Sequence, residues 1–252
     1  MLVPLRFQFE EFGREVDLLH RLARQFLAPS AERIFPRLIE VLRQVRTGGR
    51  RDEVRWEVFE REPLRTVETN RYEPGTRRGG LDVFGEVSWC WGIRPVPCKK
   101  GNPTEFNVSG NASAKLRIRT IRDDPPDGIA MWRVEFGAAD SPGCYFHTQI
   151  LGEKEQPPFP HALSVPRLPS LFVTPMAAVE FLLGELFQDQ WEQHIVGDQG
   201  DRPFWNGIQQ QRLQNLLRWK QQQLDGCQGS PWMALKKAKP LQADGLFLSR
   251  MR

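Results

Sequence analysis

The chain has 252 residues, of which 40% are hydrophobic and 26% charged, and its formal net charge is +4. This composition is close to the globular average, so it predicts a packed core and excludes a wholly disordered chain. No stretch approaches the roughly 20 consecutive apolar residues of a membrane span, and the first ten residues lack the basic and apolar regions of a secretory signal.

Two amphipathic helices are predicted near the start of the chain. Between residues 9 and 27, apolar side chains recur every three or four positions, which places them on one face of a helix. The pattern returns between residues 34 and 45 after the Pro29-Ser30 break, and it ends at Gly48-Gly49. Pro36 is expected to delay the first turn of this second helix.

About five antiparallel strands are predicted in the middle third, where the hydrophobic period changes to two. The alternating segments are 54–59, 87–94, 106–119, 131–136 and 144–151. Short turns separate the later ones, and short turns join antiparallel strands. We expect the two helices to cover one face of the sheet, and we expect the main core of this half to be formed by Trp89, Trp91, Trp132 and Phe136.

The last third is predicted to be helical. Thr174 followed by Pro175 is typical of a helix start, and the helix that follows carries an apolar stripe from Met176 to Trp191. A final helix is predicted from about 203 to 224. Its outer face is rich in glutamine, and the side chains expected to point inward are Ile208, Leu213, Leu216, Leu217 and Leu224.

These patterns predict an α+β fold, with N-terminal helices on a mostly antiparallel sheet of about five strands and two amphipathic C-terminal helices. The predicted parts are a helix-plus-sheet domain at 1–155, a Pro-rich connector at 156–173, a helical part packed on the first at 174–225 and a basic tail at 226–252. The whole positive excess lies in that tail, because the remainder of the chain is neutral. A tail of this kind can attract phosphates or acidic partners, or it can be a loose solubilising end.

The first candidate binding site is the polar face of the predicted sheet. Cations beside an aromatic ring on a flat sheet are typical of nucleic-acid binding, because charge contacts phosphates and the ring stacks on bases. An ordinary solvated face is the alternative. The candidate binding residues are Lys115, Arg117, Arg119, Arg133, Tyr145 and His147 on the sheet, with Gln149 beside them, and Lys236, Lys237 and Lys239 in the tail.

Thiol and metal chemistry find weak support in the sequence. Four cysteines in a chain without a signal are expected to be reduced thiols in the cytoplasm. Cys144 and His147 are three apart, which on a strand puts them on opposite faces, so we do not expect a nucleophile pair. Cys90 and Cys98 lack the paired spacing of a zinc site. No metal site and no cofactor are therefore predicted.

Motifs that would define an enzyme are absent: there is no phosphate loop, no dinucleotide fingerprint and no nucleophile elbow. Acidic residues cluster in sequence without a selective spacing, at Glu57, Glu60, Glu62, Glu68 and Asp82, so an unrecognised hydrolase or nuclease site stays an alternative. The sequence favours a non-catalytic binding or adaptor subunit that engages a protein partner through its sheet surface and C-terminal helices. The other alternative is a nucleic-acid-binding protein that uses the basic sheet face and tail.

Overall fold

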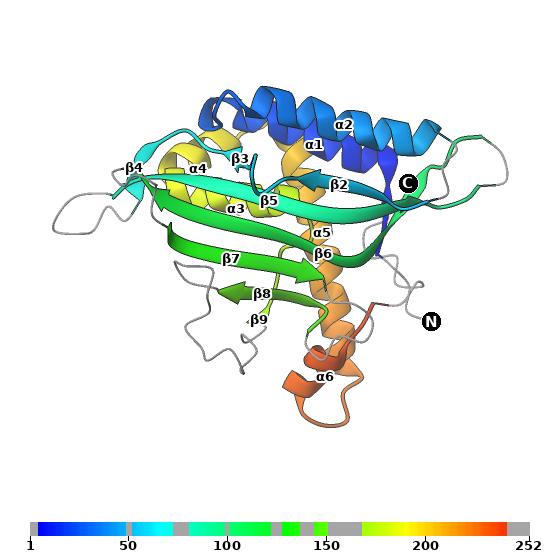
Figure 1. The fold of residues 1–252 in the computed structure, drawn as a ribbon. Coiled ribbons are helices and arrows are strands. Elements are labelled where there is room, and N and C mark those ends of the chain that lie inside the picture. Colours follow the sequence, from blue (N-terminus) through cyan, green and yellow to red (C-terminus); the bar gives the residue numbers. More distant parts are fainter. Residues whose placement is uncertain are drawn as a thin grey trace.

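The computed structural model describes residues 5–48, 52–72, 81–98, 101–121, 128–136, 144–150 and 168–240. It confirms the α+β class: one antiparallel sheet carries helices from both the N-terminal and the C-terminal part of the chain (Figure 1). None of the helices in the described ranges has both the length and the apolar character needed to cross a membrane.

The N-terminal part contains β1 (Leu5–Gln8), α1 (Phe9–Ala23), the 3-10 turn η1 (Arg24–Phe26) and α2 (Ala31–Thr47). The first predicted helix thus ends four residues early, because the chain tightens into η1 and then leaves the helix at Leu27. Pro36 does not delay α2, since the helix already begins at Ala31 and includes the proline. Both helices bury the predicted apolar stripes.

Within the described residues, nine strands form the sheet, and the five predicted segments correspond to its five main strands. They are β2 (Val54–Val58), β5 (Leu81–Pro95), β6 (Glu105–Thr120), β7 (Gly128–Phe136) and β8 (Phe146–Ile150). The four short strands that alternation did not predict are β1, β3 (Leu64–Arg65), β4 (Thr69–Tyr72) and β9 (Leu168–Pro169). Neighbouring strands follow the order β2-β5-β6-β7-β8-β9 across the sheet. In addition, β3 and β4 pair with β5, and β1 pairs with β6.

The tryptophan face of the sheet is the main core, as the alternation predicts. Trp56 faces Trp91 across β2 and β5, and the Phe12 ring of α1 lies 5.0 Å from Trp56 and 5.8 Å from Trp91 between ring centroids. Trp89 and Phe136 are buried as well. Trp132 is only partly buried, and its ring meets Phe181 of a C-terminal helix edge to face.

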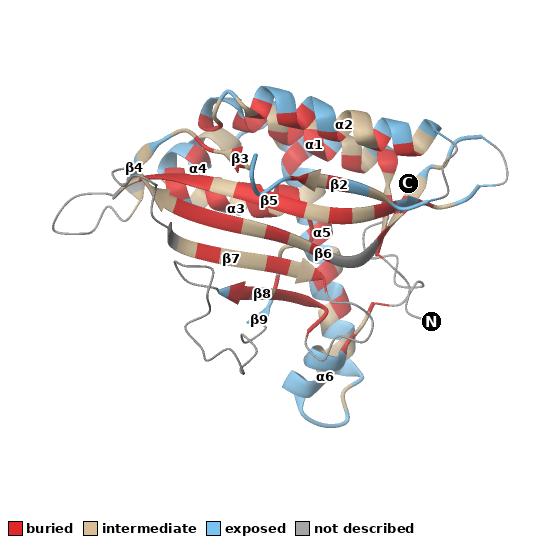
Figure 2. Cartoon of the chain, viewed as in Figure 1, coloured by how far each residue is buried: buried red, intermediate tan, exposed pale blue. Residues whose placement is uncertain are grey.

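The C-terminal part contains α3 (Pro175–Phe187), α4 (Asp189–Ile195), α5 (Arg202–Asp225) and α6 (Pro231–Lys237). Thr174 caps α3 as predicted, because its hydroxyl accepts a hydrogen bond from the amide of Ala177. Within the predicted connector, residues 168–173 are described and contain β9. Within the predicted tail, residues 226–240 are described and contain α6, which is largely exposed (Figure 2).

The predicted inward face of α5 is correct only in part, with Ile208 partly buried against the core. Leu216 is buried, but Leu213 and Leu217 are exposed, and the side chains that α5 buries besides Leu216 are Trp205, Arg212 and Trp219. These positions also follow a helical spacing of three and four. The leucine pattern missed them because it treats arginine as a surface residue, whereas Arg212 is buried against a carboxylate of α1.

The helices lie on the tryptophan face. α1 contacts Trp56 and Trp91, α3 reaches Gly85 with Leu182 and Leu186, and α5 places Trp219 against Phe146. Among the described residues, no helix packs on the opposite face, which carries the predicted cations. This one-sided arrangement leaves two places for a functional site: that polar face, and the ends of the sheet where helices meet strands.

Candidate functional site

The predicted cations do lie together on the polar face of the sheet, and most of them are paired with carboxylates. Lys115 and Arg117 both contact Glu60, the latter from Nη2 to Oε2 at 2.9 Å. Arg119 contacts Glu86 from Nε to Oε2 at 2.7 Å. Arg117 is only 6% exposed. The face therefore mixes both signs of charge, which weakens its attraction for a polyanion.

His147 is buried on the same face and held at both ring nitrogens. Nδ1 lies 2.9 Å from the backbone oxygen of Cys144, and Nε2 lies 3.0 Å from Oε2 of Glu135. Both partners are hydrogen-bond acceptors, so each faces a ring nitrogen that can donate to it. Burial raises the pKa of Glu135, but the hydrogen bond from His147 and the charge of Arg133 outweigh it and lower that pKa overall. With 2% exposure, His147 is a structural ion-pair residue and cannot reach a ligand.

Tyr145 is not on the polar face, which corrects the prediction. It precedes β8, so it does not follow the alternation of that strand, and its ring stacks on Phe136 in the core. Burial raises the pKa of its hydroxyl to about 12. The predicted combination of cations with an exposed aromatic ring on this face is therefore not formed by Tyr145.

The predicted lysines of the tail are placed differently from one another. Lys236 and Lys237 are exposed in the last turn of α6, and Lys239 is half-buried just after it. The tail residues Arg250 and Arg252 lie outside the described residues. Among the candidate cations, Lys236 and Lys237 are thus exposed, whereas the sheet cations are at most about one-third exposed.

The cysteine and carboxylate groups do not form a recognisable reactive centre in the described part of the chain. None of the four cysteines, all of which are described, forms a disulfide, and the ring of His147 contacts the backbone of Cys144 rather than its sulfur. No three His, Cys, Asp or Glu side chains among the described residues are placed to hold a metal ion. Of the acidic cluster noted in the sequence, Glu60 pairs with sheet cations, whereas Glu68 and Asp82 line a pocket.

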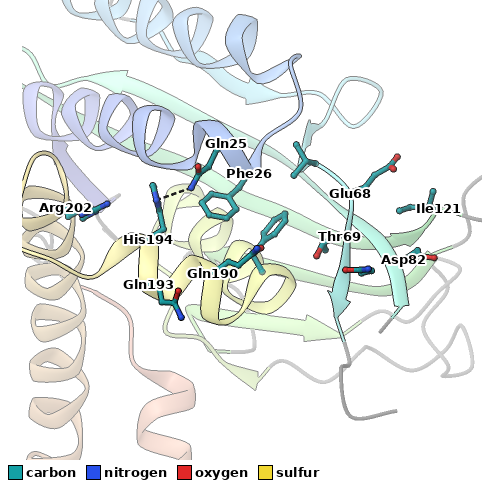
Figure 3. Close-up of a pocket in the computed structure, with 13 residues that line it drawn as sticks. Gln25, Phe26, Glu68, Thr69, Asp82, Ile121, Gln190, Gln193, His194 and Arg202 are labelled. Atoms are coloured by element: carbon teal, nitrogen blue, oxygen red, sulfur yellow. Dashed lines mark hydrogen bonds between the residues drawn. The ribbon is translucent and has the colours of Figure 1, made fainter. Parts of the chain in front are cut away.

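This pocket is an open hollow of about 910 Å³ where the sheet meets the C-terminal helices. We call it the α4–β4 pocket. Its walls come from η1, from β4 and the start of β5, and from α4, and Arg202 closes it at the start of α5 (Figure 3). A volume of this order suits a ligand of several hundred daltons or a short peptide segment.

The α4–β4 pocket combines an apolar floor with amide walls. The Phe26 and Phe187 rings pack at 5.0 Å between centroids and, with Val67 and Ile121, supply the apolar surface. The amide side chains that line it are Gln25, Asn70, Gln190 and Gln193. Within the described ranges, Asn70, Gln190 and Gln193 make no side-chain hydrogen bond. Their donors and acceptors are therefore available to a ligand.

His194 in the wall is fixed by two hydrogen bonds. Its Nε2 lies 2.8 Å from the backbone oxygen of Leu22, which can only accept, so Nε2 carries the proton. Nδ1 lies 3.1 Å from the amide nitrogen of Gln25, which donates to it. Both ring nitrogens are thereby engaged, so the imidazole positions Gln25 and offers no free nitrogen to a ligand.

Charges of opposite sign lie at the two ends of the α4–β4 pocket. Figure 3 shows Arg202 on one side of His194 and the carboxylates of Glu68 and Asp82 on the other, toward β4 and β5. Arg202 forms no ion pair or hydrogen bond with the residues that the structure describes. Glu68 is an exposed side chain 3.7 Å from Arg65. A ligand that spans the pocket thus meets positive charge at one end and negative charge at the other.

Sequence reasoning did not find this site. Gln190, Gln193 and Arg202 resemble ordinary solvent-facing helix residues, and Asn70 lies in a strand too short to show alternation. Only Glu68 and Asp82 carried a signal, as part of the acidic cluster. No protein-family model, no curated protein and no solved structure matches this chain.

Proposed function

We propose that this protein is a binding module for a partner polypeptide, and that the α4–β4 pocket holds an extended segment of that partner. The observation that carries the proposal is the lining of the pocket, which joins an apolar floor, available amides and oppositely charged ends. The site lies between one end of the sheet and a C-terminal helix, and the C-terminal helices are one of the two parts that the sequence favours for protein binding.

The amide walls support a peptide ligand. A glutamine or asparagine side chain offers both a donor and an acceptor, which is the pair of groups that each peptide unit of an extended segment presents. Gln190 and Gln193 lie on α4 and Asn70 lies on β4, so hydrogen bonds can reach the segment from both sides. The Phe26 and Phe187 rings beneath them suit one or two apolar side chains of the segment.

The charges favour a polypeptide over a nucleic acid. Glu68 and Asp82 repel phosphates, and a nucleic acid offers no positive group to pair with them. A polypeptide can carry both signs, with a carboxylate at Arg202 and a basic group at the acidic end. The pairing of Lys115, Arg117 and Arg119 with Glu60 and Glu86 also gives the nucleic-acid alternative less support on the sheet face.

Selection from a displayed library of random peptides tests the proposal, with the full chain as bait. We expect enriched peptides to carry an acidic and a basic residue separated by apolar residues. The variant Arg202→Glu is expected to weaken binding of these peptides at least tenfold and to select peptides with a basic residue in place of the acidic one. Glu68→Lys is expected to reverse the preference at the other end.

The matched control is Arg218→Glu, which makes the same charge change on the same helix. Arg218 lies sixteen positions after Arg202 and does not line the pocket. Enrichment of no peptide motif, or an equal loss of affinity in Arg202→Glu and Arg218→Glu, contradicts the proposed function.

A further inference from the structure

The exposed side of α5 differs from an ordinary surface helix because it lacks charge. Between Pro203 and Leu217, none of the exposed residues is charged. On α2, in contrast, the exposed side carries Glu32, Arg33, Arg37 and Arg43. Leu213 and Leu217 are 39% and 52% exposed toward the C-terminal end of this uncharged side, and several glutamines lie near them. Surface helices of a neutral or basic chain normally place charges there.

The spacing on this side is that of a helix-pairing seam. Asn206, Gln210, Leu213 and Leu217 are four, three and four residues apart, which is the a and d spacing of two helices that pack along their length. The buried stripe of α5 lies on another side of the helix and already packs on the body. We call the four residues the α5 seam.

We infer that the α5 seam pairs with the α5 seam of a second copy of this chain, antiparallel, to form a dimer. A twofold interface places the same patch on both partners, so the patch must match itself. An uncharged patch meets its copy without repulsion, and glutamine amides are both donors and acceptors, so identical faces can hydrogen-bond to each other. A charged partner would find no counter-charge on the seam.

The antiparallel direction follows from the charges at the end of the helix. In a parallel pair, Arg218 would lie beside Arg218 of the second chain and Asp225 beside Asp225, so like charges would meet. In an antiparallel pair, Asp225 of each chain lies near the N-terminal end of the other α5, where the helix dipole favours a negative charge. A twofold axis beside position 215 then sets Leu213 of each chain opposite Leu217 of the other, which gives two equivalent Leu–Leu contacts. The inference rests on α5 alone and is independent of the α4–β4 pocket.

Sedimentation and light scattering of the full chain test the dimer. At roughly 100 μM, well above the dissociation constant of a micromolar dimer, the wild-type chain is expected at twice its 29.1 kDa mass. The double variant Leu213→Glu/Leu217→Glu is expected at the single-chain mass. The control Gln211→Glu/Gln222→Glu changes the charge equally at exposed α5 positions off the seam and is expected to stay dimeric.

A mixing experiment tests the register and does not depend on the loss of association alone. Leu213→Lys and Leu217→Glu are each expected to be monomeric, because each homodimer would bury two charges. Mixed together, they are expected to form a heterodimer with one Lys–Glu pair and one intact Leu–Leu contact. A monomeric wild-type chain, a control variant as monomeric as the seam variant, or a mixture that stays monomeric would each overturn the inference.

Discussion

The carboxylate of Glu15 on α1 lies 2.8 Å from the guanidinium of Arg212 on α5, and both side chains are almost wholly closed to solvent. The other oxygen of Glu15 accepts hydrogen bonds from Thr174 at 3.0 Å and Gln209 at 2.9 Å. Burial raises the pKa of Glu15 more than Arg212 and these hydrogen bonds lower it. The pair joins the first helix to the last long one.

Replacing Arg212 with methionine is expected to remove the counter-charge and leave the Glu15 carboxylate buried alone. Breaking one side of a buried ion pair costs about 3–5 kcal/mol, so the unfolding free energy at neutral pH should fall by about that amount. Urea unfolding followed by circular dichroism measures it. The double variant Glu15→Gln/Arg212→Met removes both charges of the pair and should recover part of the loss.

The same variant has a defined pH dependence. Without Arg212, the pKa of Glu15 rises further in the folded state, so the folded chain takes up a proton that the unfolded chain does not. Stability then increases as pH falls from that raised pKa toward the unfolded value. We expect the loss of unfolding free energy in Arg212→Met, relative to wild type, to become smaller as pH falls from neutral to about 5. A deficit that is constant over this range, or single and double variants of equal stability, contradicts the ion-pair account.

Glu135 should act in the opposite direction. Its pKa is lowered in the folded state, so its contribution to stability is present above the unfolded value of about 4.3 and is lost as pH falls below it. Glu135→Gln should cost about 1–3 kcal/mol at neutral pH, and the difference from wild type should shrink toward pH of about 3. Urea curves across this range measure the difference. Glu62→Gln, at an exposed position, should show no such trend. A stability difference between wild type and Glu135→Gln that stays constant with pH would refute the prediction.

Two glycines should respond oppositely to alanine. A Cβ on Gly85 of β5 would lie 2.6 Å from Cδ2 of Leu182 and 2.7 Å from Cδ1 of Leu186, so it would push against α3 and cost about 1–3 kcal/mol. A Cβ on Gly13 of α1 meets nothing within 4 Å. Gly13→Ala should therefore stabilise the chain by about 0.5–1 kcal/mol through helix propensity. The midpoints of thermal unfolding should shift in opposite directions in the two variants. A Gly85→Ala variant with an unchanged midpoint would show that α3 can move away from the added Cβ at no cost.

Among the candidate binding residues, the two lysines of α6 should contribute most to binding of a polyanion, because they are exposed. Lys236→Glu/Lys237→Glu is expected to lower the salt concentration at which the chain leaves a heparin column, because these two lysines are exposed. Arg33→Glu/Arg43→Glu makes the same charge change on exposed positions of α2 and should lower the eluting salt concentration by a smaller amount. Equal shifts in the two variants would show that retention reflects net charge alone.

The sheet and the opening helices were predictable because their burial follows a simple period. Trp89 and Trp91 alternate with polar residues, and the structure buries both on one face. Short strands such as β3 and β9 have two residues each, too few to show any period. Tyr145 was misplaced because it lies one residue before β8, where the alternation has not begun.

The candidate site was not predictable in the same way. The α4–β4 pocket takes its lining from η1, β4, β5 and the C-terminal helices, so it exists only once the tertiary fold has formed. Arg212 escaped notice for a related reason: its burial depends on Glu15, and no local pattern links residues so far apart. Periodicity reports which face of an element is buried and not which elements meet.

The distant partners of Glu15 affect how the chain can fold during synthesis. Thr174 is made 159 residues after Glu15, and Gln209 is made 194 residues after it. At ribosomal rates of about 5–20 residues per second, this buried carboxylate waits roughly 10–40 s for the second of them. Until then α1 lacks part of its cover, so the nascent chain exposes an apolar surface that a chaperone can occupy, and the fold closes only after α5 has been made.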